Sequence, residues 1–75
     1  MITVGKTYEV DIRDCCVEGE FTSKLIKVLV CDEDSDIDDM FEVEELHEHN
    51  YGAELYFENG VRLTKQGGVS LTEVN

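Results

Sequence analysis

Residues 53–65, AELYFENGVRLTK, place an Asn-Gly pair between two runs of alternating apolar and polar side chains, a strong sequence signal for a β-hairpin. A two-residue turn at Asn59 and Gly60 competes with a three-residue turn that adds Glu58 and holds Gly60 in the left-handed region. Only the three-residue turn brings the apolar side chains of both strands to one face, namely Leu55, Phe57, Val61 and Leu63. Burial of four such side chains, at ~1.5–3 kcal/mol each, outweighs the small difference between the turns, so we expect the three-residue turn.

A second hairpin is predicted over residues 6–30. Residues 6–12 alternate between polar and apolar side chains, and residues 21–30 are rich in leucine, isoleucine and valine. A two-residue turn at Glu18 and Gly19 would gather apolar side chains of both strands on one face. The pairs expected from that turn are Cys16 with Phe21, Ile12 with Leu25, and Tyr8 with Leu29.

The predicted hairpin leaves one face of its second strand uncovered. That face carries Ile26, Val28 and Val30 against polar side chains of the first strand. A long strand that bends and serves both halves of a small barrel would cover these three side chains.

Residues 69–74 predict a last strand after the glycine pair at 67–68, which brings the expected number of strands to about five. Short antiparallel strands in one small domain, residues 1–75, are typical of an SH3-like or OB-like barrel, whose closure removes unpaired edges. We therefore expect a mainly β fold, a small five-stranded antiparallel barrel with an acidic insertion at about residues 31–52.

Within the insertion, residues 38–48 favour a short helix. Asp36 or Asp38 could cap its start, further acidic residues fill its first turn, and histidines follow near its end. As a strand, the segment would align only Phe41 and Val43 on one face. A helix here would make the fold α+β.

The insertion also dominates the charge of the chain, which is −12 overall. Ten carboxylates lie between Cys31 and His49, and residues 28–61 contain no lysine or arginine. Such a charge argues against direct binding to nucleic acid or to anionic lipid, and it favours a basic protein or cations as partners. No apolar run approaches the ~20 residues of a membrane-spanning helix.

Cysteine usage predicts a reducing compartment. The three cysteines are an odd number, and the sequence shows no secretory signal, so we expect free thiols and a cytoplasmic location. Cys15 and Cys16 are adjacent, and on a strand their side chains would point to opposite faces.

A calcium loop is the metal site that the acidic spacing most resembles. In the frame DSDIDDMFEVEE the expected ligands would be Asp34, Asp36, Asp38, Glu42 and Glu45. The sixth position, where the loop needs glycine, is Asp39, and the preceding residues predict a strand where the motif has a helix. The histidine pair at 47 and 49 lacks further zinc ligands at the usual spacing. We therefore expect no metal and no cofactor.

Enzyme chemistry finds little support in the sequence. It contains no phosphate-binding loop, no nucleophile elbow and no nucleophile–base pair at an informative spacing. A chain this short also has little room for a deep substrate pocket. We expect a protein that is not an enzyme.

The function that the acidic surface favours is binding to a basic protein, most concretely to a nucleic-acid-binding protein whose basic groove it would occupy as a DNA mimic. Small size, extreme charge and the absence of catalytic motifs resemble phage-encoded or mobile-element inhibitors of host defence, such as anti-restriction and anti-CRISPR factors. Carboxylates would stand in for phosphates and apolar side chains would anchor the contact. The expected partner-binding residues are Asp34, Asp36, Asp38, Asp39, Met40, Phe41, Glu42, Glu44, Glu45, Glu48, Tyr51, Glu54 and Glu58.

Two alternatives remain open from the sequence. One is a structural or accessory subunit of a larger assembly, with the apolar face of Ile26, Val28 and Val30 as its interface and the charge serving solubility. The other is a calcium-binding domain. The sequence predicts no oligomeric state.

Overall fold

The computed structural model describes residues 1–13, 18–31, 40–47 and 52–74. These residues form a small, mainly β domain of antiparallel strands, without a helix and without closure into a barrel. The strands are β1 (Ile2–Thr3), β2 (Thr7–Arg13), β3 (Glu18–Cys31), β4 (Met40–Val43), β5 (Glu45–Leu46), β6 (Glu54–Phe57), β7 (Arg62–Thr64) and β8 (Val69–Glu73).

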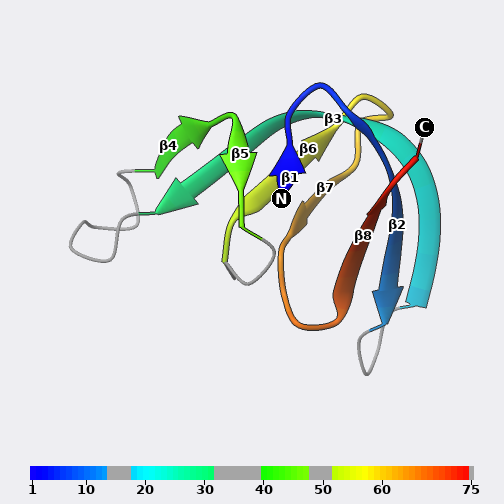
Figure 1. The fold of residues 1–75 in the computed structure, drawn as a ribbon. Coiled ribbons are helices and arrows are strands. Elements are labelled where there is room, and N and C mark those ends of the chain that lie inside the picture. Colours follow the sequence, from blue (N-terminus) through cyan, green and yellow to red (C-terminus); the bar gives the residue numbers. More distant parts are fainter. Residues whose placement is uncertain (14–17, 32–39, 48–51, 75) are drawn as a thin grey trace.

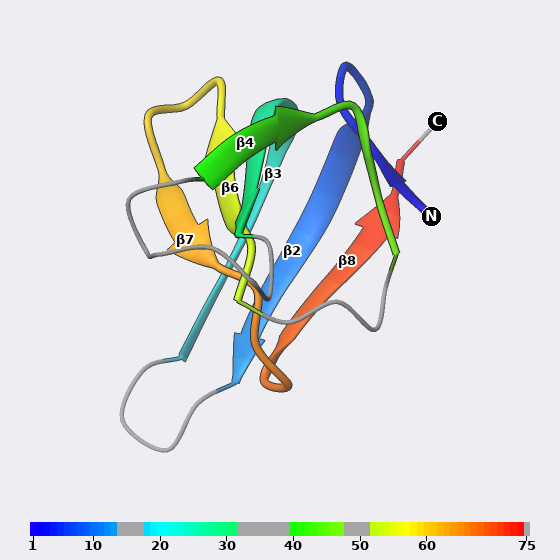
Figure 2. The same ribbon diagram turned by 90° about the vertical axis from the view of Figure 1, so that its left-hand side faces the viewer.

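One strongly curved sheet contains most of the strands, in the order β7-β6-β3-β2-β8, with β4 paired to β3 beside that path. Since Val28 of β3 pairs with both β4 and β6, these two strands lie on opposite edges of β3. A separate pair, β1-β5, joins the N-terminal residues to the segment after β4. Figure 1 shows β3 arching over the sheet, with β2 and β8 at one end and β4 at the other, and Figure 2 shows β2 and β8 side by side.

The helix expected over residues 38–48 is wrong where the structure describes the segment, because Met40–Val43 and Glu45–Leu46 are the strands β4 and β5. The pairing of β2 with β3 stops at Thr7 and Lys24, and β3 runs on to Cys31, so its last residues have no partner from β2 on that edge. Strand β4 supplies one, from Val28 opposite Val43 to Cys31 opposite Met40. Ladder hydrogen bonds and burial of Leu46 thus override the local helix signal, while residues 38, 39 and 48 lie outside the described ranges.

The expected register of the β2–β3 hairpin is also wrong. Tyr8 lies opposite Ser23, and the last pair is Arg13 with Glu18, so the connection comprises residues 14–17. The shift from the expected register is an even number of residues, so the side chains of the part of β3 that pairs with β2 keep their predicted face. Further along β3, Val28 and Leu29 lie on the faces opposite to those predicted for them. The shift leaves the second half of β3 unpaired with β2 and available to β6 and β4.

The β6–β7 hairpin confirms the three-residue turn. Leu55 pairs with Leu63, and the Phe57 amide donates to the Val61 carbonyl oxygen at 2.9 Å. Gly60 has a φ of 90°, and its amide donates to the Phe57 carbonyl oxygen at 3.0 Å. The predicted last strand is confirmed as β8, which pairs along β2.

The 14-residue strand β3 serves both halves of the fold, as the uncovered face of its sequence predicted. Its pairing with β6 is irregular between Leu25 and Lys27. At this bulge the alternation of faces changes, so that Leu25 and Val28 are both fully buried while Ile26 is 48% exposed. Because Val28 lies in the core, it is not available for the alternative interface proposed from the sequence.

The core lies inside the curve of the sheet. Phe21 and Phe57 meet edge to face there, with ring centroids 5.1 Å apart. The buried apolar side chains are Ile2, Tyr8, Val10, Leu25, Val28, Leu46, Ala53, Leu55 and Phe57.

Candidate acidic surface

The expected binding residues divide between described and undescribed parts of the chain. Asp34, Asp36, Asp38, Asp39, Glu48 and Tyr51 lie outside the described residues. The remaining ones are Met40, Phe41, Glu42, Glu44, Glu45, Glu54 and Glu58.

Two of these carboxylates lie in one row across three strands. Leu29 of β3 pairs with Glu42 of β4 on one side and with Glu54 of β6 on the other. Directly paired residues share a face of a sheet, so Glu42 and Glu54 flank Leu29 on the outer face. Two strand spacings put their Cα atoms roughly 10 Å apart. We call Glu42, Leu29 and Glu54 the acidic row.

The neighbouring row on the same face carries positive charge, which the sequence order concealed. Tyr56 of β6 pairs with Lys27 of β3 on one side and with Arg62 of β7 on the other. The Tyr56 hydroxyl donates to Glu54 Oε2 at 2.8 Å, and Lys27 Nζ lies 5.4 Å from the centre of the Tyr56 ring. Residues 28–61 contain no lysine or arginine, but the sheet places Lys27 and Arg62 on either side of Tyr56, next to the acidic row. The period-2 alternation around the confirmed Leu55–Leu63 pair would have predicted this neighbour.

Of the three side chains predicted as anchors, Met40 and Phe41 lie on opposite faces of β4, and Tyr51 lies outside the described residues. Met40 is two residues from Glu42, shares its face and is half-buried. Phe41 pairs with Val30 on the other face and is 48% exposed. Only Met40 therefore extends the acidic row.

The other described carboxylates of the set lie on different elements. Glu44 is exposed between β4 and β5, and its carbonyl oxygen accepts from the Val4 amide at 2.8 Å. Glu45 lies opposite Thr3 on β5. Glu58 follows β6, where its amide donates to the Lys24 carbonyl oxygen at 2.9 Å.

Of the five expected calcium ligands, only Glu42 and Glu45 lie in the described residues, and they belong to different sheets. In the described ranges, no group of three or more histidine, cysteine or acidic side chains could hold a metal ion. Asp34, Asp36 and Asp38 lie outside those ranges.

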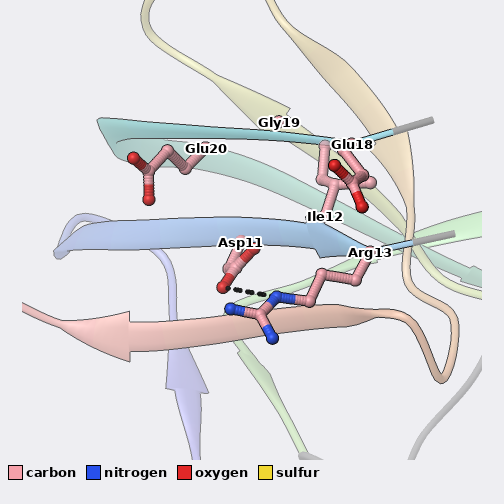
Figure 3. A pocket seen from close by; sticks show the side chains of 6 residues that line it. All are labelled: Asp11, Ile12, Arg13, Glu18, Gly19 and Glu20. Carbon is pink, nitrogen blue, oxygen red and sulfur yellow. Dashed lines mark ion pairs between the residues drawn. The ribbon is translucent and has the colours of Figure 1, made fainter.

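A second acidic region, not singled out from the sequence, covers the outer face of the β2–β3 hairpin. Asp11 lies directly opposite Glu20, a repulsive pair, and Arg13 Nε lies 3.4 Å from Asp11 Oδ2. Figure 3 shows the Arg13 side chain extending back along β2 to Asp11, beside an open hollow of about 430 Å³. The alternating acids of residues 9–11 and 18–20 were a usable signal for this face.

At the far end of β2 a different carboxylate is neutralised. Lys6 Nζ lies 3.0 Å from Glu73 Oε1. The hydrogen bond to Glu73, with the attraction of that carboxylate, raises the pKa of Lys6. The Lys6 ammonium group thus offsets the charge of Glu73.

No family model matches the chain, and neither a curated protein nor a solved structure matches it. Within the described part of the chain, no helix is long and apolar enough to cross a membrane. The surface itself is therefore the basis for a functional proposal.

Proposed function

We propose that this protein is a small acidic binding module, a DNA mimic that occupies the basic nucleic-acid-binding surface of a partner protein. The observation that carries the proposal is a charge of −12 together with carboxylates held on neighbouring strands in the acidic row. Inhibition of a host nuclease, in the manner of a phage or mobile-element anti-defence factor, is the role that best fits such a module.

The spacing of the acidic row supports this proposal. The separation of roughly 10 Å between Glu42 and Glu54 equals about three phosphate steps along the axis of one DNA strand, at ~3.4 Å per step. Both residues sit on strands whose backbones β3 fixes, so little entropy is lost when a partner orders them. Acidic side chains on a flexible segment would lose more entropy on binding.

Binding would begin with electrostatic steering and end with apolar contact. The net negative charge attracts a basic groove over a distance set by the salt concentration. Met40 then lies next to Glu42 as an anchor on the same face. In architecture, we interpret the curved sheet as an open relative of the small SH3-like and OB-like barrels, which carries no functional inference by itself.

The proposal is tested by capturing partners from a cell lysate on the immobilised protein and eluting them with duplex DNA. A DNA mimic releases its partner when DNA competes for the same groove, and it releases it at high salt. A partner that remains bound in excess DNA contradicts the proposal.

Matched variants distinguish the contribution of the acidic row to partner binding from the contribution of the total charge. The double variant Glu42→Gln, Glu54→Gln and the double variant Glu18→Gln, Glu20→Gln remove the same number of charges on different surfaces. We expect the first to weaken capture by about tenfold or more, since charge pairs at an interface can contribute ~1.5 kcal/mol and above. Equal weakening by both variants would show that only net charge matters.

A further inference from the structure

The strand order of the sheet ends in two edge strands, β7 and β8, and β4, which lies beside that order and pairs with β3, is a further edge. An edge strand exposes unpaired backbone groups to which an extended segment of another chain can pair, and lysine or arginine on the edge discourages this. Strand β7 has only three residues and carries the exposed Arg62. Strand β8 has five residues, VSLTE, without a basic side chain. Of the two strands that end the strand order, β8 is therefore the less protected; it is also one residue longer than β4.

The backbone of β8 alternates between its two sides. The Arg13 amide donates to the Gly68 carbonyl oxygen at 2.8 Å, and the Val74 amide donates to the Thr7 carbonyl oxygen at 2.9 Å. By the alternation of an antiparallel ladder, Ser70 and Thr72 also bond to β2, and Leu71 directs its amide and carbonyl away from β2. Leu71 thus offers a donor and an acceptor at the free edge, where the described residues supply no further strand.

The outer face beside this edge suits positive charge. Ser70 pairs with Asp11, whose carboxylate already lies 3.4 Å from Arg13 Nε, and Thr72 pairs with Glu9. Ser70 and Thr72 are short and exposed, so long basic side chains on an added strand can reach over them to the carboxylates of β2. Those carboxylates would lie two strand spacings, roughly 10 Å, from the added backbone.

The inner face beside the same edge suits small apolar side chains instead. Val69 and Leu71 lie on this face, are half-buried and pack against the core.

We infer that the free edge of β8 binds an extended basic segment of a partner protein, in which basic and small apolar residues alternate, by antiparallel strand addition. This inference rests on the proposed function, because that function supplies a basic partner. It assigns to the partner a second contact, separate from the acidic row.

The test is titration of isotope-labelled protein with a short synthetic peptide in which lysine alternates with valine, followed by NMR and amide hydrogen exchange. Strand addition should slow exchange of the Leu71 amide by about tenfold or more, because a hydrogen-bonded amide exchanges only on opening. Ser70 and Thr72 already bond to β2, so their amides should change little. Unchanged exchange at Leu71 with saturating peptide overturns the inference.

Two controls separate strand addition from simple charge attraction. A peptide of the same composition, with its lysines and valines in separate blocks, keeps the charge and loses the alternation. The variants Ser70→Lys and Thr64→Lys each add one positive charge, on β8 and β7 respectively, at exposed positions. We expect Ser70→Lys to weaken peptide binding by about fivefold and Thr64→Lys to change it much less. Equal binding of both peptides, or equal effects of both variants, overturns the inference.

The remaining outcomes are also decisive. Protection of Leu71 that grows with protein concentration in the absence of peptide would mean that a second copy of this chain occupies the edge, which overturns the assignment to a basic segment. The Glu42→Gln, Glu54→Gln variant should retain protection of Leu71 by the peptide. Failure at the edge with intact DNA-sensitive capture would leave the proposed function standing, and the reverse result would remove that function alone.

Discussion

Gly60 holds the β6–β7 turn in a backbone conformation, with φ at 90°, that other residues adopt only at a cost. Its neighbours reinforce the turn through side-chain hydrogen bonds. Asn59 Oδ1 accepts from the Val61 amide at 3.0 Å, and Ser23 Oγ of β3 accepts from the Asn59 amide at 3.2 Å. The turn is therefore fixed both within the hairpin and against the neighbouring strand.

Replacement of Gly60 with alanine should lower the free energy of unfolding by about 1 kcal/mol or slightly more. A Cβ atom at Gly60 would meet nothing within 4 Å, so the loss would come from the backbone conformation and not from a clash. Urea denaturation measures it. Gly19→Ala is the matched control, because Gly19 also has open space and does not have a positive φ. Equal stability of both variants would contradict this account.

At the residue scale, sequence prediction succeeded where the cause is local. The Asn-Gly pair and its flanking apolar residues lie within one hairpin. They determine the turn conformation at Gly60 and the pairing of Leu55 with Leu63. The orientation of Phe41 and Met40 could not be predicted in this way. It depends on the pairing of β4 with a distant part of β3.

At the element scale, β3 is the strand on which the fold depends. Its first half pairs with β2, and its second half pairs with β6 and β4. The bulge at Ile26 lets one strand present buried side chains to both halves. Any change that weakens β3 should therefore affect the entire sheet.

Two substitutions near the bulge should separate the two faces of β3. Val28→Ala removes methyl groups from a side chain with no exposed area, and it should destabilise the fold by about 1–3 kcal/mol. Ile26→Ala changes a side chain that is 48% exposed and should cost less than about 1 kcal/mol. Chemical denaturation of both variants provides the measurement. A larger loss for Ile26→Ala would show that the described faces are wrong.

The elements illustrate why prediction stopped where it did. Alternation and glycine turns predicted the β6–β7 hairpin and β8, since each signal lies inside its own segment. The predicted register of β2 with β3 was wrong because the connection comprises residues 14–17, and not the expected two-residue turn at Glu18 and Gly19. The helix prediction was wrong because β4 forms by pairing with the last residues of β3. The short stretch of sequence from which a helix is predicted does not contain that partner.

At the scale of the whole molecule, the charge of −12 opposes compaction. The described sheet relieves part of this repulsion locally, at the Lys6–Glu73 and Arg13–Asp11 pairs. Both pairs are largely exposed, so each contributes little to stability. Repulsion among the remaining carboxylates should therefore respond strongly to dissolved ions.

Addition of sodium chloride from low to about 0.5 M should raise the melting temperature by a few degrees, roughly 1 kcal/mol of stability. Screening weakens repulsion in the folded state more than in the expanded chain. Differential scanning calorimetry measures the change, and potassium chloride at equal ionic strength should give the same curve. A melting temperature that falls as salt is added would contradict a dominant role for self-repulsion.

The position of β8 beside β2 has a kinetic consequence. Tyr8 pairs with Glu73, so the sheet is complete only when segments from near the two ends of the described chain have met. Such distant pairings lose the entropy of closing a long loop before any stabilising contact between the two segments forms. Folding should therefore take milliseconds to seconds, slowly for a chain of this size, and until then β2 would expose the edge that β8 later covers.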